Sequence, residues 1–376
     1  MKHNYSRYWY TLIIIFSVFI LSLMSWIQFF SVKVLKNEED NGINIEPGLL
    51  GTIKYAYHST VDFFDANWNV YNEKTFSNID SVLSYYLIKD FDSIQVLAGE
   101  NNWLFYKGAV DCNPIADFEG TNQFTNLEMN EILDKTLTIQ DYLIDKDIKF
   151  SLLIPPNKEN IYYEYMPKDY SYSNSSRTDE LVKYLYDNGV NVISPKEELL
   201  KYHNDLQLYY KYDTHWNQLG AYIGVKNVLN SWNECIPSIN DKKILKTNLK
   251  GQYHYCAEDD LAKMVGMLNY FDDEIEYSIN EDYSIKWEEF EEEQNSNQIS
   301  LFKNVNAANK KKLLLVGDSF RTAMIPSLVE EYSEVYVVHR SYFNKEMIEK
   351  INPEYFILEY VERFSGELKY VDSLFN

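Results

Sequence analysis

The sequence predicts an α/β protein, in which a three-layer α/β/α domain with a mostly parallel sheet follows one N-terminal transmembrane helix. Two observations predict the layers. Short apolar runs recur without polar alternation, as in strands buried on both faces, and segments with helical spacing separate them. A third observation predicts the membrane helix: residues 8–30 carry no charged side chain and exceed the roughly 20 residues that span a bilayer.

The N-terminal region divides into an anchor and a linker. The apolar span is longer than the core of a signal peptide and no A-x-A-like cleavage site follows it, which favours an uncleaved signal anchor over a cleaved signal. Residues 1–30 are therefore predicted to be a cytoplasmic tail and transmembrane anchor, residues 31–60 a linker, and residues 61–376 the main domain. Two Lys or Arg side chains precede the span and two follow it closely, so charge alone leaves its orientation open.

The main domain reads as strands alternating with helices. Strands are predicted at residues 96–108 (strand, turn and strand), 149–156, 190–194, 311–318, 334–338 and 354–360. Helices are predicted at residues 126–146, 178–188 and 217–232, with further helical patterns between the last three strands. The acidic run at residues 287–298 is predicted to be a solvated excursion between sheet elements.

Composition limits the partners. The formal net charge is −22, and so acidic a surface repels phosphate backbones, which argues against nucleic acid and mildly against a strongly anionic polymer as substrate. The 33 tyrosines supply core volume or rings that stack on sugars. The three cysteines fit no metal spacing. Cys235 and Cys256 either form a disulfide and leave Cys112 free, or all three are buried thiols.

A first motif places a serine at the end of a buried strand. In the run KKLLLVGDSF, Gly317 lets the chain turn without a Cβ clash, and Ser319 opens the next helix. Ligands of open parallel sheets bind at the carboxyl ends of strands, so the Ser319 hydroxyl is expected in that crevice. Its backbone N–H is expected to be a free donor that favours an anion. The alternative is that Ser319 only caps the helix.

A second motif supplies what a nucleophilic serine requires. Asp213 and His215 are two residues apart in the stretch YDTHWN, a spacing that lets the carboxylate reach the far ring nitrogen of the histidine. A serine needs a base, and the base needs a group that orients it, so the two motifs together predict a triad of Ser319, His215 and Asp213. No metal site is predicted, since one Asp-x-His pair without a third ligand cluster is too little.

The two motifs resemble those of the SGNH-hydrolase-like alginate O-acetyltransferase family (the AlgX and AlgJ type, also called DHHW proteins). That family has an Asp-x-His-Trp motif upstream of a Gly-Asp-Ser-Phe motif, here residues 213–216 and 317–320. Segments across residues 96–363 are also similar to the family: GENNWLFYKG, LLIPPNKENIYYEYMP, DDLAKMVGM and EYVER. In ordinary SGNH esterases the Asp and His follow the serine, whereas here and in this family they precede it.

The resemblance implies roles for these residues within an SGNH-hydrolase-like fold. Ser319 would be the nucleophile and, through its backbone N–H, an oxyanion donor. His215 would be the general base and Asp213 the carboxylate that orients it. Trp216 is the first candidate for binding sugar, or else it packs under the loop.

The resemblance also implies transfer of acetyl groups to an exported or cell-surface polysaccharide, with the catalytic domain outside the cytoplasmic membrane. The expected partners are the polysaccharide acceptor, a membrane-bound O-acyltransferase (MBOAT) that presents the acetyl group, and lipid around residues 8–30. No cofactor is expected.

Two other functions stay open. The same triad with water as acceptor makes a carbohydrate acetylesterase, and the choice depends on how well the site excludes water. The third function is a non-catalytic scaffold for polysaccharide assembly, against which the intact Asp213, His215 and Ser319 argue.

Overall fold

A computed structural model of the protein describes residues 81–375, with gaps at 83, 87–88, 92, 110–111, 249–258, 269, 272 and 280–298. The chain divides into two compact units, Met1–Asp90 and Phe91–Asn376, and the second holds the sheet and the site. The predicted anchor, linker and acidic run lie outside the described residues and stay predictions. Among the helices that are described, none is both long enough and apolar enough to cross a membrane.

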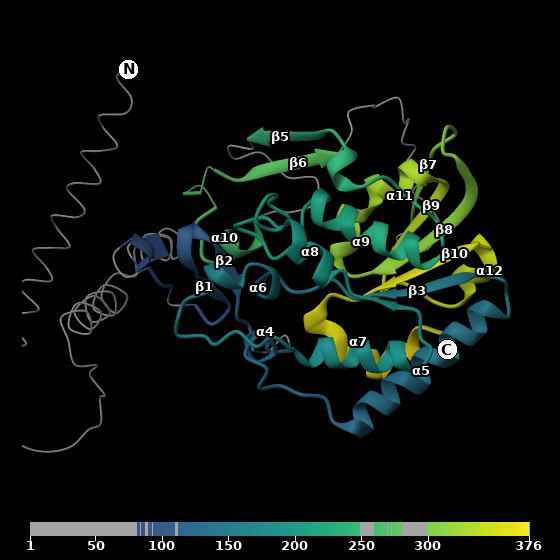
Figure 1. The fold of residues 1–376 in the computed structure, drawn as a ribbon, viewed down its shortest axis with the longest axis horizontal. Helices are drawn as coiled ribbons and strands as arrows, with labels where there is room; N and C mark the ends of the chain where they lie inside the picture. The colour runs from purple at the N-terminus through teal and green to yellow at the C-terminus, as the bar shows by residue number, and fades with distance from the viewer. Residues whose placement is uncertain are drawn as a thin grey trace, which may run out of the picture. The chain divides into compact units, whose positions relative to one another are not determined.

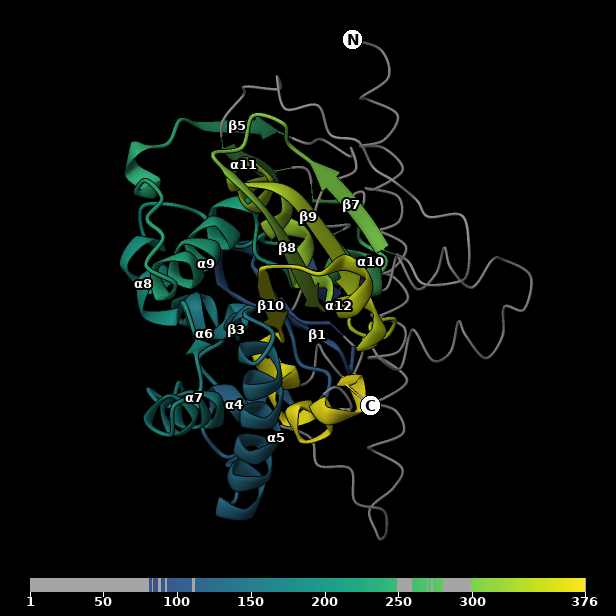
Figure 2. The same cartoon turned by 90° about the vertical axis from the view of Figure 1, so that its right-hand side faces the viewer.

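The centre of the second unit is a six-stranded mixed sheet with the strand order β4-β3-β10-β8-β9-β7. Its strands are β3 (Lys149–Leu153), β4 (Val192–Ile193), β7 (Ile299–Lys303), β8 (Asn309–Gly317), β9 (Tyr332–His339) and β10 (Tyr355–Glu359). All neighbours pair in parallel except β7, which pairs antiparallel with β9 at one edge. Figure 2 shows β7, β9, β8 and β10 side by side in this order. The predicted, mostly parallel sheet is confirmed.

Alternate residues of the central strands face opposite layers. On β8, Leu313 and Leu315 join one buried apolar cluster, and Leu314 and Val316 join the other. Because both faces are apolar, the strand reads as a continuous apolar run rather than an alternating one.

Helices cover both faces of the sheet. One cluster is covered by α9 (Gln218–Ser231) and α11 (Ile325–Glu331), and the other by α5 (Asn126–Ile144), α7 (Arg177–Asp187) and α12 (Glu346–Ile351). Figure 1 shows α9 and α11 on one side of the sheet, with α5 and α7 on the other. The helices α5 and α7 begin with capping boxes, which explains where the helical spacing starts.

Short elements complete the unit. Two antiparallel pairs lie outside the main sheet: β1 (Val96–Ala98) with β2 (Leu104–Tyr106), and β5 (Ile244–Asn248) with β6 (Ile275–Ile279). The short α-helices are α4 (Pro114–Phe118), α6 (Lys158–Ile161), α8 (Lys196–Tyr202) and α10 (Asp260–Met264). The 3₁₀ helices are η1 (Glu100–Asn102), η2 (Tyr163–Tyr165), η3 (Ile239–Asp241), η4 (Ser319–Met324) and η5 (Glu362–Phe375). The predicted strand, turn and strand at 96–108 is confirmed.

Candidate active site

The turn after β8 presents Ser319 at the carboxyl edge of the sheet. Ser319 is exposed and is the first residue of η4, so its backbone N–H has no acceptor within that helix. The carboxylate of Asp318 caps the turn: Oδ1 accepts the N–H of Phe320 at 3.0 Å, and Oδ2 accepts the N–H of Val361 at 2.9 Å. Because Asp318 does the capping, the Ser319 hydroxyl remains available for chemistry.

Gly317 is required by a close approach from β10. A Cβ at this position would lie 2.3 Å from Oε2 of Glu359, whose side chain is fully buried. The same oxygen accepts the N–H of Asp318 at 2.9 Å. Burial, and then the neighbouring Asp318 carboxylate, raise the pKa of Glu359 well above its ordinary value. The expectation that Gly317 avoids a Cβ clash is confirmed, and the clash would be with a side chain of the adjacent strand.

The loop before α9 brings His215 to Ser319. Nε2 of His215 lies 2.6 Å from Oγ of Ser319, and Nδ1 lies 2.5 Å from Oδ1 of Asp213. Asp213 is fully buried, His215 is half-buried and Ser319 is exposed. The structure therefore brings the three residues together in the order carboxylate, imidazole and hydroxyl, an arrangement that suits nucleophilic serine chemistry.

A buried lysine holds the loop that carries Asp213. Nζ of Lys158 donates to the carbonyl oxygens of Tyr210 at 3.2 Å, Lys211 at 3.1 Å and Asp213 at 2.6 Å. Burial lowers the pKa of Lys158 to about 8, because the ammonium group loses its water. Sequence reasoning quoted this segment only for its similarity to the family and assigned Lys158 no role.

A second carboxylate lies behind the loop. The N–H of Asp260 donates to Oδ2 of Asp213 at 3.0 Å. The Asp260 carboxylate accepts the N–H of Thr214 at 2.8 Å and its hydroxyl at 2.6 Å. One oxygen of Asp260 also lies 3.8 Å from Nδ1 of His215. Asp260 is a residue that sequence reasoning missed, although the segment DDLAKMVGM was noted for its similarity to the family.

These carboxylates make His215 a stronger base than a free imidazole. Burial disfavours the charge of Asp213, but the adjacent His215 and the N–H donors outweigh it and hold the pKa of Asp213 below its ordinary value. Burial also disfavours a charge on His215, but the attraction of Asp213, followed by that of Asp260, raises the pKa of His215.

Trp216 is not available to a sugar. Its side chain is fully buried, and its Nε1–H donates to the carbonyl oxygen of Phe320 at 2.8 Å. The assignment of Trp216 to substrate binding is therefore wrong, and the packing alternative is correct. The indole ties the loop of His215 to the turn of Ser319.

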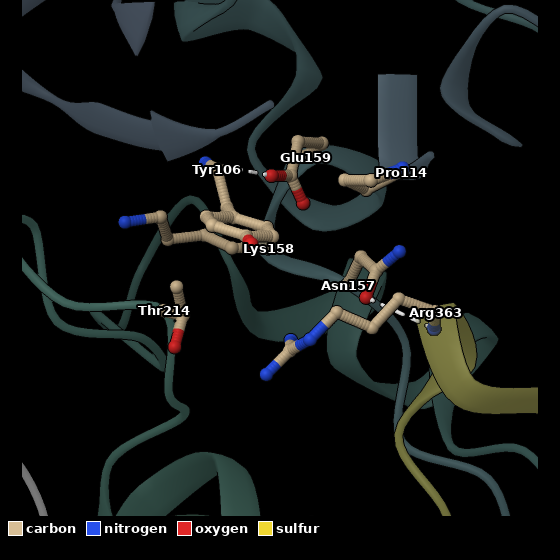
Figure 3. Close-up of a pocket in the computed structure, with 7 residues that line it drawn as sticks. All are labelled: Tyr106, Pro114, Asn157, Lys158, Glu159, Thr214 and Arg363. Atoms are coloured by element: carbon tan, nitrogen blue, oxygen red, sulfur yellow. Dashed lines mark hydrogen bonds between the residues drawn. The ribbon is translucent and has the colours of Figure 1, made fainter. Parts of the chain in front are cut away.

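A crevice opens beside the same loop. The Arg363 crevice is lined by Tyr106, Pro114, Asn157, Lys158, Glu159, Thr214 and Arg363. Figure 3 shows the Arg363 side chain extending toward Thr214, with its backbone N–H bonded to Oδ1 of Asn157 at 3.3 Å. Sequence reasoning predicted none of these as site residues, although Asn157 and Arg363 lie in segments that resemble the family.

Three groups of this site lie close enough to share a metal ion. They are Asp213, His215 and Asp260, and they form the one such cluster in the part of the chain that the structure describes. Asp260 is the third group that the sequence analysis did not find. The carboxylate oxygens already accept hydrogen bonds, however: those of Asp213 from His215 and Asp260, and those of Asp260 from Thr214.

Two of the three cysteines, Cys112 and Cys235, lie among the described residues. Cys235 is exposed rather than buried, so the expectation of a buried thiol is wrong for this residue. Cys256 lies outside the described residues, and its pairing with Cys235 stays a prediction.

A family model matches this chain. Residues 96–333 match the family described as ALGX, the SGNH hydrolase-like domain of the acetyltransferase AlgX. None of the curated proteins matches the chain.

Two solved structures share the fold at low sequence identity, and a third is reported with them. A structure of Bacillus cereus PatB1 is 14% identical, with a TM-score of 0.51, over 72% of this chain and 96% of its own. A second structure of PatB1, with a sulfonyl adduct, has a TM-score of 0.50 at 14% identity and the same coverage, 72% and 96%. A DHHW family protein from Eubacterium siraeum is 16% identical, with a TM-score of 0.47, over 65% of this chain and 88% of its own. The fold is an SGNH-hydrolase-like α/β fold with a mixed sheet.

Proposed function

We propose that this chain, which belongs to the SGNH hydrolase-like AlgX family, is a membrane-anchored O-acetyltransferase that acts outside the cytoplasm on an exported or cell-surface polysaccharide. The observation that carries the proposal is the exposed Ser319 hydroxyl, 2.6 Å from Nε2 of His215, whose Nδ1 faces the buried Asp213. A hydroxyl beside an oriented base can form a covalent acyl intermediate. The description of the family as an acetyltransferase supports acetyl as the acyl group.

The reaction has two half-reactions. Oγ of Ser319 attacks the carbonyl carbon of an acetyl donor while Nε2 of His215 takes the hydroxyl proton. The carbonyl oxygen carries the negative charge until the leaving group departs with that proton. A sugar hydroxyl then attacks the acetyl ester and gives its proton to His215, and Ser319 takes a proton back as the ester breaks. Asp213 holds the imidazole in position and stabilises the imidazolium that forms in each half-reaction.

The same proposal includes a location and a donor. Residues 8–30 anchor the chain in the lipid of the cytoplasmic membrane as a single pass, with the catalytic domain outside. A membrane-bound O-acyltransferase partner presents the acetyl group there, and the reaction uses no cofactor. Protease added to intact, wall-stripped cells should digest the chain after residue 40, whereas full protection of that region contradicts this topology.

A carbohydrate acetylesterase is the second candidate. The exposure of Ser319 favours it, because water reaches an exposed hydroxyl as easily as a sugar does. A non-catalytic scaffold, the third candidate, requires that Ser319 never carries an acyl group.

Product analysis with the full-length protein tests these candidates. An activated acetyl ester is supplied with and without an oligosaccharide, and mass spectrometry follows both the sugar and the peptide that contains Ser319. Acetyl on Ser319 with acetylated sugar as the main product supports transfer, and acetate as the sole product indicates an esterase. A Ser319 that reacts with neither the ester nor a serine-directed sulfonyl fluoride indicates the scaffold.

A further inference from the structure

An arginine that forms no ion pair with any described residue lies beside the candidate active site. The Arg363 guanidinium contacts the rings of Phe320 and Phe364, whose centroids lie 5.4 and 5.0 Å from its Cζ. Among the described residues, no carboxylate lies within ion-pair distance of this guanidinium, and it makes no hydrogen bond to them. Arg363 is half-buried, and a buried charge usually has a partner. Because the described residues provide none, the guanidinium donors are available to a ligand.

The guanidinium is close to the reacting groups. The ring of Phe320, the residue after Ser319, lies 5.0 Å from the His215 ring and 5.4 Å from Cζ of Arg363. Thr214, the residue before His215, lines the crevice that Arg363 enters (Figure 3). The His215 ring and the Arg363 guanidinium therefore both lie against the ring of Phe320, the residue that follows Ser319.

The backbone of Arg363 is held in place before any ligand arrives, and the rings of Phe320 and Phe364 pack against its guanidinium. Its backbone N–H donates to Oδ1 of Asn157 at 3.3 Å. The preceding residue, Glu362, is buried, and its carboxylate accepts the N–H of Asn157 at 2.8 Å and the hydroxyl of Ser176 at 2.6 Å. A donor that is already in place costs little reorganisation when charge develops beside it.

A second donor in the same crevice lacks a partner. Asn157 is 2% exposed, and its Nδ2 has no hydrogen-bond partner among the described residues. Buried polar groups are nearly always hydrogen-bonded, so an unmatched buried amide in a crevice indicates that an oxygen atom completes it.

We propose that Arg363 is the charged donor of an oxyanion site and that its guanidinium meets the carbonyl oxygen of the acyl group on Ser319 as that oxygen becomes negative. The backbone N–H of Ser319 is the other donor, and Asn157 holds Arg363 in position from behind. This inference rests on the proposed function, because it requires an acyl group on Ser319.

A small acyl oxygen suits this crevice better than an anionic group of the acceptor does. The crevice is too narrow to enclose a larger group, so only an atom at its mouth can approach the guanidinium. Glu159 in its wall and the net charge of −22 also disfavour a carrier of permanent negative charge. A carbonyl oxygen is small and is charged only during the reaction.

Substitution of Arg363 in the full-length protein tests the proposal. Arg363→Met keeps the length of the side chain and its packing on the rings but removes the charge. With a neutral activated acetyl ester, kcat for acylation should fall about 10²–10³-fold while KM changes little, as on loss of one oxyanion donor. Arg363→Lys keeps the charge without the planar fork and should be intermediate. Methylguanidinium should restore part of the rate to Arg363→Ala.

Arg340→Met is the matched control. Arg340 also contacts the ring of Phe364, at 5.0 Å, but it is paired with Glu367 and does not line the crevice. Its substitution should leave acylation unchanged, and an equal fall in both variants indicates a structural role for Arg363. If Arg363→Met acylates normally and loses only transfer to anionic acceptors, the guanidinium binds the acceptor instead. Ser319→Ala distinguishes a failure of the Arg363 proposal from a failure of the proposed function. Acylation that survives Ser319→Ala overturns the proposed function as well.

Discussion

The carboxyl and amino edges of the main sheet each carry a polar cluster with a carboxylate and at least one hydroxyl group, but the two clusters are organised differently. At the carboxyl edge, Asp213 and His215 leave one ring nitrogen facing the exposed hydroxyl of Ser319. At the amino edge, the carboxylate of Glu234 accepts the hydroxyls of Tyr332, at 2.6 Å, and Tyr355. The second cluster uses its donors and acceptors on one another, whereas the first keeps a nucleophile and donors for a ligand.

The larger cavity does not lie at the edge that carries the candidate active site. The cleft beside Glu234 encloses about 1,090 Å³, open solvent included, against about 200 Å³ for the Arg363 crevice. The larger cleft contains no base oriented toward a nucleophile among its described lining residues. Unmatched donors and an oriented base, rather than volume, therefore indicate where the chemistry lies.

Ser319→Ala should have the largest effect, because it should make the carboxyl edge as unreactive as the amino edge. Acylation should fall by up to about 10⁶-fold, because losing the nucleophile of a triad removes most of its catalysis. The melting temperature should not change, since an exposed hydroxyl leaves no cavity. Stopped-flow acylation and calorimetry on the same samples measure both quantities. Ser341→Ala, at another exposed serine, is the control. An acylation rate that survives Ser319→Ala removes this serine from the mechanism.

Asp213→Asn should have the next largest effect. The amide holds the wrong tautomer of His215, and the expected fall in kcat is about 10⁴-fold. Pre-steady-state rates with a neutral acetyl ester measure it. Glu234→Gln makes the same chemical change at the amino edge and should leave those rates unaltered. A comparable loss in both variants contradicts the distinction between the edges.

Much of the fold and the three central residues of the site could be predicted because their signals are local. The apolar runs at 311–318 and 354–360 are strands because both of their faces are buried. Asp213 and His215 interact across two residues, and Ser319 directly follows a strand-end turn. Strand β7 was missed, because four of its five residues are only partly buried and the strand lacks a continuous apolar run.

The supporting residues could not be given roles from the sequence, because their contacts join distant segments. Lys158 lies 55 residues from Asp213, to whose carbonyl it donates, and Asp260 lies 47 residues from the carboxylate that it contacts. Arg363 depends on the chain returning after β10 to the end of β3. Trp216 was misassigned because an aromatic residue beside a catalytic motif suggests a ring that stacks on sugar. Its indole is instead buried, with its N–H bonded to the carbonyl oxygen of Phe320.

The pH dependence of activity should report the raised pKa of His215 at the carboxyl edge. His215 must be neutral to act as a base, and its pKa is raised above 6.5, so the acid limb of kcat/KM should have its midpoint above pH 6.5. Below the midpoint the rate should fall about tenfold per pH unit.

The stability that His215 contributes changes with pH in the opposite direction to the rate, whereas the stability that Asp213 contributes is lost at low pH. With a raised folded-state pKa, His215 contributes stability that is fully present below 6.5 and is lost as pH rises through the raised value. Asp213, with a lowered pKa, contributes stability above 3.8 that is lost as pH falls through its folded-state value. Rates and melting temperatures from pH 5 to 9 test the two directions expected for His215, with His215→Gln as the control that removes the histidine contribution. An acid limb centred below pH 6.5 contradicts the role assigned to the carboxylates.

Tyr332→Phe should give the smallest effect, and it acts on the amino edge alone. The hydroxyl of Tyr332 donates to Oε2 of Glu234 at 2.6 Å, and hydrogen bonds to charged groups contribute about 1.5–3 kcal/mol. The loss should be about 1.5 kcal/mol, at the lower end of that range. The reason is that the Glu234 side chain is 26% exposed and water can replace the donor.

Acylation of Ser319 should be unchanged in Tyr332→Phe, because the two clusters lie at opposite ends of the sheet. Strand β9 has 8 residues, Tyr332–His339, so its ends are seven steps of about 3.3 Å, or about 23 Å, apart. Chemical unfolding and acylation rates of the full-length protein measure the two quantities. Tyr336→Phe, on the same strand, removes a hydroxyl that donates to Glu334 two residues away and should cost less. If Tyr332→Phe slows acylation more than the unfolded fraction explains, the edges are coupled through β9, and the amino-edge cluster is part of the catalytic machinery rather than a purely structural counterpart to it.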